Sequence, residues 1–185
     1  MSLEGLHNLT FDEFVELPEE LHKGAELFDG MVHVSSPVPK HQDAAFNVAA
    51  ALQRWCRAEP GRGKMIIEYL VRINVRSGYK PDVAWYSADR IPDRDAPAAL
   101  APPSIVVEVL SPSTRSDDLM RKPGGYASVG VEEMWSVDVD NLSVMLLRRP
   151  VGAGYAEVND VPADGAMTSP LLPGFSLAVA DVFVE

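Results

Sequence analysis

The sequence holds a single cysteine, Cys56, in 185 residues. One thiol allows neither an intrachain disulfide nor a thiolate metal cluster. No apolar run approaches the ~20 residues that a transmembrane helix requires, and the first residues lack the basic and apolar regions of a signal peptide. These absences predict a soluble, cytoplasmic protein that does not bind membranes.

Basic residues are also scarce: 16 lysines and arginines stand against 27 acidic residues, a net charge of −11. That balance argues against a protein that coats nucleic acid nonspecifically. The charge is uneven, because residues 54–80 carry seven basic and two acidic side chains, or +5, which leaves −16 for the remainder. This segment favours either a local phosphate-binding patch or an ordinary solvated surface.

The length and the 46% hydrophobic content predict one domain, residues 1–185, with a sizeable core. Local patterns in its first half predict, in order, a short helix from Thr10 to Pro18, a hairpin turning at Asp29-Gly30, a helix over 39–58, a long strand over 64–75, a turn at Gly78 and a strand over 82–86. The second half predicts a proline-rich connection over 87–103, a strand over 104–110, a helix starting near Ser116, and a hairpin of 134–137 and 144–147. The predicted fold class is α/β, one sheet with helices packed against it.

Glu108 is the most informative residue, because it interrupts the apolar run of the strand over 104–110. Such a run indicates burial on both faces, and an isolated buried carboxylate either takes up a proton or finds a cation. A structural ion pair, for example with Arg115, is one interpretation, and a functional site is the other.

Asp82 follows Pro81 at the entrance of the preceding strand. If the two strands are neighbours, the carboxylates of Asp82 and Glu108 converge on one cation. Two hard oxygen ligands completed by waters are typical of a Mg²⁺ site, and such an ion polarises phosphoryl oxygens.

The order of these residues resembles a known nuclease family. Pro81-Asp82, Glu108 within an apolar strand, the run 108–114, Tyr126 and the run 130–138 resemble the family labelled putative restriction endonuclease, a branch of the PD-(D/E)XK nuclease superfamily. The resemblance covers residues 10 to 183. It implies a restriction-endonuclease-like core, a central mixed β-sheet flanked by helices.

The resemblance also implies a catalytic site. It makes Asp82 and Glu108 metal ligands for Mg²⁺ or Mn²⁺, with the backbone carbonyl of Val109 beside them and Glu26 as a third carboxylate. Leu110 stands where the superfamily lysine is expected, and the family's displaced lysine matches Lys122, which would position the attacking water and offset transition-state charge.

Three of these assignments have alternatives. Pro123-Gly124-Gly125 follows Lys122 and disfavours a helix interior, so the helix starts late, kinks or breaks. Glu26 is equally consistent with a surface acid. His41 begins the apolar stripe of the helix over 39–58 and is expected to be a core histidine that faces the sheet, with a site role as the second interpretation.

The leading hypothesis is a Mg²⁺-dependent nuclease that hydrolyses phosphodiester bonds, most plausibly in DNA. A homodimer is expected because symmetric dimers are the commonest oligomers. A catalytically inactive nuclease-fold binding module is the alternative. A metal-dependent hydrolase of a small phosphorylated ligand is the third hypothesis, and it would need an enclosed pocket.

Overall fold

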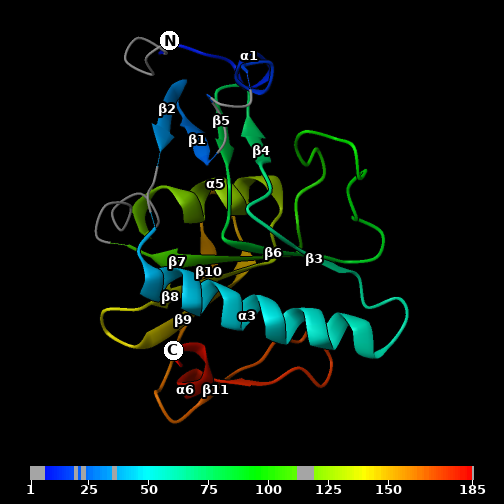
Figure 1. The fold of residues 1–185 in the computed structure, drawn as a ribbon, viewed down its shortest axis with the longest axis vertical. Helices are drawn as coiled ribbons and strands as arrows, with labels where there is room; N and C mark the ends of the chain where they lie inside the picture. Colours follow the sequence, from blue (N-terminus) through cyan, green and yellow to red (C-terminus); the bar gives the residue numbers. More distant parts are fainter. Residues whose placement is uncertain (1–6, 19–20, 22–23, 35–36, 112–118, 185) are drawn as a thin grey trace.

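Three β-sheets organise the part of the chain that the computed structural model describes, residues 7–18, 21, 24–34, 37–111 and 119–184. The large sheet has six strands, the small sheet has four, and a two-stranded ribbon lies near the C-terminus. In Figure 1 the small sheet lies at the top, the large sheet crosses the middle, and the C-terminal elements lie below. The small sheet and the C-terminal elements are therefore on opposite sides of the large sheet.

The large sheet has the strand order β10-β9-β8-β7-β6-β3. Strand β7 runs parallel to β8, and the other neighbours are antiparallel. Every residue of β7 is buried, as its continuous apolar run predicts. The strands of this sheet are β3 (Lys64–Ile67), β6 (Val83–Tyr86), β7 (Ile105–Leu110), β8 (Glu133–Asp138), β9 (Ser143–Pro150) and β10 (Tyr155–Val161).

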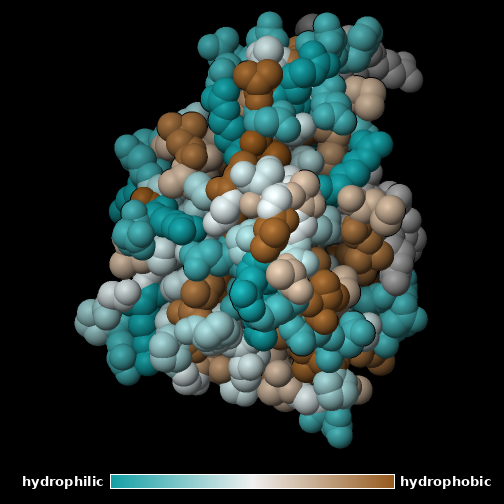
Figure 2. Space-filling view, turned by 180° about the vertical axis from the view of Figure 1, so that it is seen from behind, coloured by the Kyte–Doolittle hydropathy of each residue, from teal (hydrophilic) through white to brown (hydrophobic). Residues whose placement is uncertain are grey.

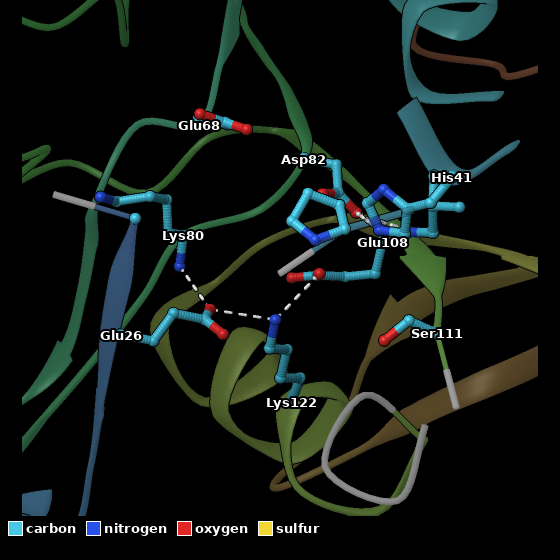
Figure 3. A pocket seen from close by; sticks show the side chains of 11 residues that line it. Glu26, His41, Glu68, Lys80, Asp82, Glu108, Ser111 and Lys122 are labelled. Atoms are coloured by element: carbon cyan, nitrogen blue, oxygen red, sulfur yellow. Dashed lines mark hydrogen bonds and ion pairs between the residues drawn. The ribbon is translucent and has the colours of Figure 1, made fainter. Parts of the chain in front are cut away.

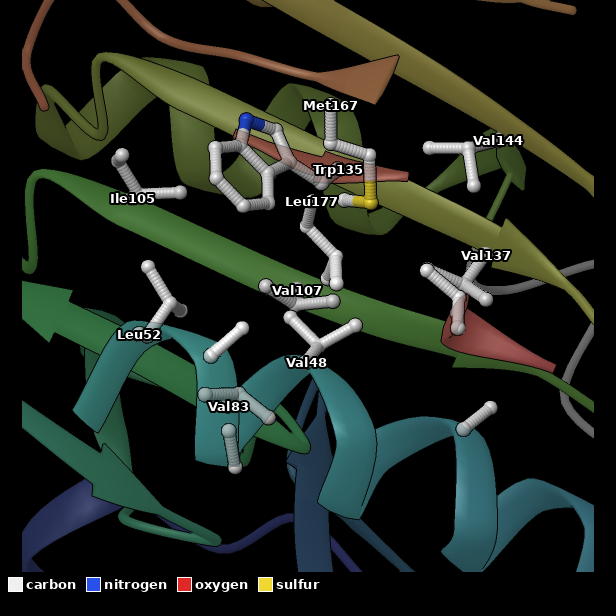
Figure 4. Packing of buried hydrophobic residues seen from close by; sticks show 14 of the residues in the cluster. Val48, Leu52, Val83, Ile105, Val107, Trp135, Val137, Val144, Met167 and Leu177 are labelled. Atoms are coloured by element: carbon white, nitrogen blue, oxygen red, sulfur yellow. The ribbon is translucent and has the colours of Figure 1, made fainter. Parts of the chain in front are cut away.

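Helix α3 (Pro39–Ala58) covers one face of the large sheet, with the bounds that the sequence predicts. Its side chains Val48 and Leu52 project toward Val107 and Ile105 of β7 (Figure 4). The C-terminal elements pack into the same core. They are β11 (Ala166–Met167), β12 (Leu177–Ala178) and α6 (Val179–Val182).

Helix α5 (Lys122–Val129) and the small sheet cover the other face. Tyr126 of α5 packs in one cluster with Val106 and Met134 of the large sheet and with Phe28 and Tyr79 of the small sheet. The small sheet has the order β2-β1-β5-β4, and its strands are β1 (Ala25–Phe28), β2 (Met31–Val34), β4 (Val71–Asn74) and β5 (Ser77–Tyr79). From behind, hydrophobic side chains are scattered among hydrophilic ones (Figure 2).

The predicted strand over 64–75 is wrong as a single element. It divides into β3 of the large sheet and β4 of the small sheet. The break falls at Glu68, whose φ of 47° turns the backbone out of the extended region. Both pieces are rich in β-branched residues, so propensity alone did not reveal that they pair with different sheets.

The predicted turn at Gly78 is also wrong. The chain turns at Val75 and Arg76, and Gly78 lies within β5. A Cβ atom at Gly78 would stand 2.4 Å from Cε2 of Phe11, in helix α1 (Phe11–Val15). The glycine therefore allows close packing of α1 on the small sheet rather than a turn.

Other local predictions are confirmed. Thr10 and Glu13 form the capping box of α1, Asp29 and Gly30 join β1 to β2 with positive φ angles, and β8 pairs with β9 as a hairpin. The predicted helix start near Ser116 lies outside the described residues. No helix in the described part of the chain combines the length and apolar content needed to cross a membrane.

Candidate active site

A small polar pocket of about 80 Å³ lies where the small and large sheets meet beside the start of α3 (Figure 3). Charged side chains from both sheets and from α5 line it. Its lining residues are Gly24, Glu26, Pro37, His41, Glu68, Lys80, Asp82, Glu108, Val109, Ser111 and Lys122. The structure thus brings together all four residues that the sequence proposes for catalysis or metal binding: Glu26, Asp82, Glu108 and Lys122.

Asp82 and Glu108 come from adjacent antiparallel strands, as the sequence argument requires. Val83 pairs with Val107, so Asp82, just before β6, stands opposite Glu108 in β7. Asp82 Oδ2 accepts a hydrogen bond of 2.7 Å from the backbone amide of Val109. This bond fixes one acid beside the other, and both line the same pocket.

The Glu108 carboxylate is 2% exposed and contacts two side chains of α5. Lys122 Nζ lies 2.9 Å from its Oε2, and the Tyr126 hydroxyl donates a hydrogen bond of 2.5 Å to its Oε1. The buried charge is therefore balanced by a lysine, and Arg115, the partner suggested from the sequence, lies outside the described residues.

Lys122 is the first residue of α5, and Pro123 falls in the first turn. Proline is tolerated there because first-turn amides have no partner within the helix. Gly125 permits a close approach, since a Cβ at that position would stand 2.5 Å from Cε2 of Tyr79. Of the three alternatives for Pro123-Gly124-Gly125, a break is the observed one. Leu119 and Met120 are helical, Arg121 forms a turn, and α5 begins at Lys122, whose side chain lines the pocket.

Glu26 is a buried residue of β1, 9% exposed, and not the surface acid that its acidic neighbours suggested. Its Oε1 lies 3.0 Å from Lys122 Nζ and accepts a hydrogen bond of 2.7 Å from the Lys80 backbone amide. The ammonium group of Lys122 therefore joins Glu26 of the small sheet to Glu108 of the large sheet (Figure 3).

His41 is buried near the N-terminus of α3 and faces the sheet, as the apolar stripe predicts. Its Nε2 lies 3.5 Å from Asp82 Oδ2, so it also borders the pocket. Its Nδ1 is buried and has no hydrogen-bond partner among the described residues. The burial of His41 agrees with the first interpretation, and a role in the site stays a prediction.

Comparison with protein families gives a match over residues 11–180, to the model described as "Putative restriction endonuclease" (Uma2). The chain belongs to the Uma2 family. Among solved structures, a "putative nuclease belonging to DUF820" from Anabaena variabilis ATCC 29413 is similar in fold, with a TM-score of 0.81, 21% identity, and coverage of 95% of this chain and 97% of that chain. The comparison with curated proteins found no match.

The family match confirms the resemblance identified from the sequence, and the structural match confirms the predicted mixed α/β core. In this Uma2 chain, the sequence analysis gave no role in the site to Lys80, which lines the pocket, and named Tyr126 only as part of the family pattern, although its hydroxyl donates to Glu108. Tyr126 follows Lys122 by four residues, so the two share a helix face, and that spacing was the available signal. Burial lowers the pKa of Lys80, while the charges of Glu68 and Glu26 act in the opposite direction.

The basic segment over 54–80 does not act as one patch in the Uma2 fold. Arg72 forms an ion pair with Asp12 of α1, and Arg76 donates a hydrogen bond to the backbone of Asp29. Both therefore support the small sheet. Only part of the segment's positive charge is left near α3 and β3.

The donor chemistry of the pocket fits Mg²⁺. Asp82 and Glu108 offer carboxylate oxygens, and Mg²⁺ is commonly held by one or two carboxylates together with waters and substrate phosphates. No group of three or more His, Cys, Asp or Glu side chains in the described ranges is arranged to hold an ion by itself. Such a pocket suits an ion whose shell is completed by water and substrate rather than an all-protein cage.

Proposed function

We propose that this Uma2 protein is a Mg²⁺-dependent nuclease that hydrolyses phosphodiester bonds, with DNA as its substrate. The observation that carries the proposal is the contact between Lys122 and Glu108, 2.9 Å, in a pocket that also contains Asp82. The family resemblance implies catalytic roles for the same three residues, and the fold brings them to one pocket from three separate segments of the chain.

Asp82 and Glu108 are the proposed ligands of Mg²⁺, which supplies polarisation of the phosphoryl oxygens when it is bound. Glu26 stays a predicted third ligand. Its observed contact with Lys122 supports a second role, that of orienting the ammonium group.

The reaction is a hydrolysis. The oxygen of a water molecule forms a bond to phosphorus and the water gives up one proton, while the ester P–O bond breaks and the leaving oxygen takes up one proton. The Lys122 ammonium donates hydrogen bonds toward the attacking water and the phosphate oxygens and so stabilises the negative charge that develops in the transition state. The Tyr126 hydroxyl and the Val109 amide hold the two carboxylates in position.

The test is the nicking of supercoiled plasmid DNA in Mg²⁺ and in Mn²⁺ by the wild-type protein and by Glu108→Gln. Glu133→Gln is a matched control, because Glu133 of β8 lies in the same sheet as Glu108, is equally buried, accepts hydrogen bonds from Trp135 and Ser169, and does not line the pocket. We expect nicking that requires the metal, that falls at least about 100-fold in Glu108→Gln and that persists in Glu133→Gln.

Equal nicking by wild type and Glu108→Gln would reject the proposal. An absence of cleavage, with oligonucleotide binding retained, would instead support the inactive binding module. The homodimer stays a prediction from base rates, and sedimentation equilibrium of the wild-type chain tests it directly.

A further inference from the structure

A second and larger cavity lies along α3 and opens next to the pocket. This groove has a volume of about 970 Å³ and shares Pro37, His41, Glu68 and Asp82 with the pocket. Its walls are α3 and the edge strand β3. The lining residues that belong to the groove alone are Gln42, Ala45, Phe46, Ala49, Ala50, Gln53, Arg54, Arg57, Ala58, Met65 and Ile67.

The floor of the groove is apolar although the protein is strongly acidic. Alanines of α3 face Met65 and Ile67 of β3 across it. Phe46 stands at the groove with 71% of its surface exposed, and Ile67 is 58% exposed. An exposed apolar surface beside a polar site typically marks a place where a ligand binds.

The charges of the groove change sign along its length. Glu68 and Asp82 lie at the end shared with the pocket, and Arg54 and Arg57 lie at the end toward the C-terminus of α3. From His41 to Arg57 the helix rises by about 24 Å at ~1.5 Å per residue, which spans several nucleotides of an extended strand. Gln53 accepts hydrogen bonds from Arg57 at 2.8 and 3.0 Å in the amide orientation that satisfies both groups, so this guanidinium is held at the groove.

We propose that the groove binds an unpaired strand of nucleic acid leading away from the phosphate at the pocket. This inference rests on the proposed nuclease function and adds a substrate class, single-stranded or locally unpaired nucleic acid. Bases stack on Phe46 and cover the apolar floor, while phosphates contact Arg54 and Arg57. Aromatic platforms combined with a basic track are the usual means of binding single strands.

Two observations favour a strand over a protein partner. The groove is continuous with the proposed phosphodiesterase pocket, and its arginines complement the phosphates of a strand that enters there. In a duplex the faces of paired bases are covered by the neighbouring base pairs of the stack, so only unpaired bases can lie flat on Phe46 and the alanine floor.

The test measures binding and cleavage separately. Binding of a fluorescein-labelled 15-nucleotide single-stranded DNA is followed by anisotropy in EDTA, and cleavage is followed with that oligonucleotide and with bis(4-nitrophenyl) phosphate, which is too small to fill the groove. The variants are Phe46→Ala and the double variant Arg54→Ala/Arg57→Ala. Leu100→Ala and Arg149→Ala are matched controls, because both residues are exposed and neither lines the groove.

We expect the dissociation constant to rise about 5- to 100-fold in Phe46→Ala. In the arginine variant we expect weaker binding with a smaller dependence on salt. Hydrolysis of the small ester should be unchanged in both, and the blunt duplex of the same sequence should bind more weakly than the single strand.

Unchanged oligonucleotide binding in both groove variants would overturn the inference while leaving the nuclease proposal intact. A change from dimer to monomer in Phe46→Ala, again with unchanged binding, would assign the groove to a second copy of the chain. Failure of the wild type to cleave either substrate, with groove-dependent binding retained, would overturn the nuclease proposal and keep the strand-binding groove.

Discussion

Asp82 accepts a hydrogen bond of 2.7 Å from the backbone amide of Val109, the residue that follows Glu108 in β7. A side chain just before β6 thus takes the place of a backbone partner at the point where pairing between the two strands ends. The bond couples the position of one proposed metal ligand to the strand that carries the other. Each acid therefore supports the local structure as well as being a proposed metal ligand. Substitutions at these positions must be chosen so that the two effects can be told apart.

Asp82→Asn and Asp82→Ala make that separation. Asparagine keeps an acceptor for the Val109 amide and removes the charge, whereas alanine also leaves a part-buried amide without its partner, at a cost of about 1–3 kcal/mol. We expect both variants to lose Mn²⁺ binding in calorimetric titration and only Asp82→Ala to melt at a clearly lower temperature. Asp160→Asn, an exposed acid on β10, is the control. Wild-type metal affinity in Asp82→Asn would remove Asp82 from the ligand set.

Lys122→Met tests the buried cation. The substitution removes the ammonium group that contacts both Glu26 and Glu108. Breaking a buried ion pair lowers the free energy of unfolding by about 3–5 kcal/mol. Chemical denaturation should show this loss, and the double variant Lys122→Met/Glu26→Gln should recover part of it, because one of the two carboxylates is then neutral. The matched control is Lys64→Met, at an exposed position of β3. A double variant no more stable than the single one would show that Glu26 and Lys122 are not coupled.

Tyr126→Phe removes the hydroxyl that donates to Glu108 Oε1. We expect a loss of about 10- to 100-fold in nicking activity, the usual effect of removing a group that orients a metal ligand. Tyr155→Phe is a close control, since its hydroxyl donates to the Val131 carbonyl on the same side of the sheet. Each variant loses one hydrogen bond worth about 1 kcal/mol. If both variants lost activity equally, the effect would come from stability and not from the site.

Alkaline pH should weaken the packing of α5. Burial, with a smaller contribution from Asp29, raises the pKa of Tyr79 from 10.0 to about 12, and this ring packs edge-on against Tyr126 with centroids 5.5 Å apart. In the unfolded chain the phenol loses its proton near pH 10, so the stability that Tyr79 contributes is complete below pH 10 and is lost as the pH rises toward 12. Urea unfolding at several pH values should show a shallower alkaline loss in Tyr79→Phe. Identical slopes for the two proteins would exclude this contribution.

Local sequence patterns predicted the elements well where a short segment decides its own structure. The hairpin at Asp29-Gly30, the bounds of α3 and the buried strand around Glu108 follow from turn chemistry and periodicity. The break at Glu68 and the role of Gly78 did not follow, because sheet membership and the approach of Phe11 are set by residues far away in the chain.

The sequence predicted the acids and the lysine of the site, but not the role of the residues that surround them. Asp82, Glu108 and Lys122 carry charges that are conspicuous in an apolar or glycine-rich setting. The sequence shows Tyr126 only as part of the family pattern, without a role, and Phe46 as an ordinary helix residue. Only the packing of α5 and β3 shows that the first contacts Glu108 and that the second lines a groove beside the pocket.

Glu26 comes from one sheet and Glu108 from the other, with the Lys122 side chain between them. The pocket is therefore lined by both sheets and bridged by one ammonium group. A ligand bound in the pocket would contact side chains of both sheets at once. Binding of such a ligand should stabilise the folded protein and raise its melting temperature. A thermal shift screen of nucleotides and divalent ions can therefore detect binding in the pocket even when no bond is cleaved.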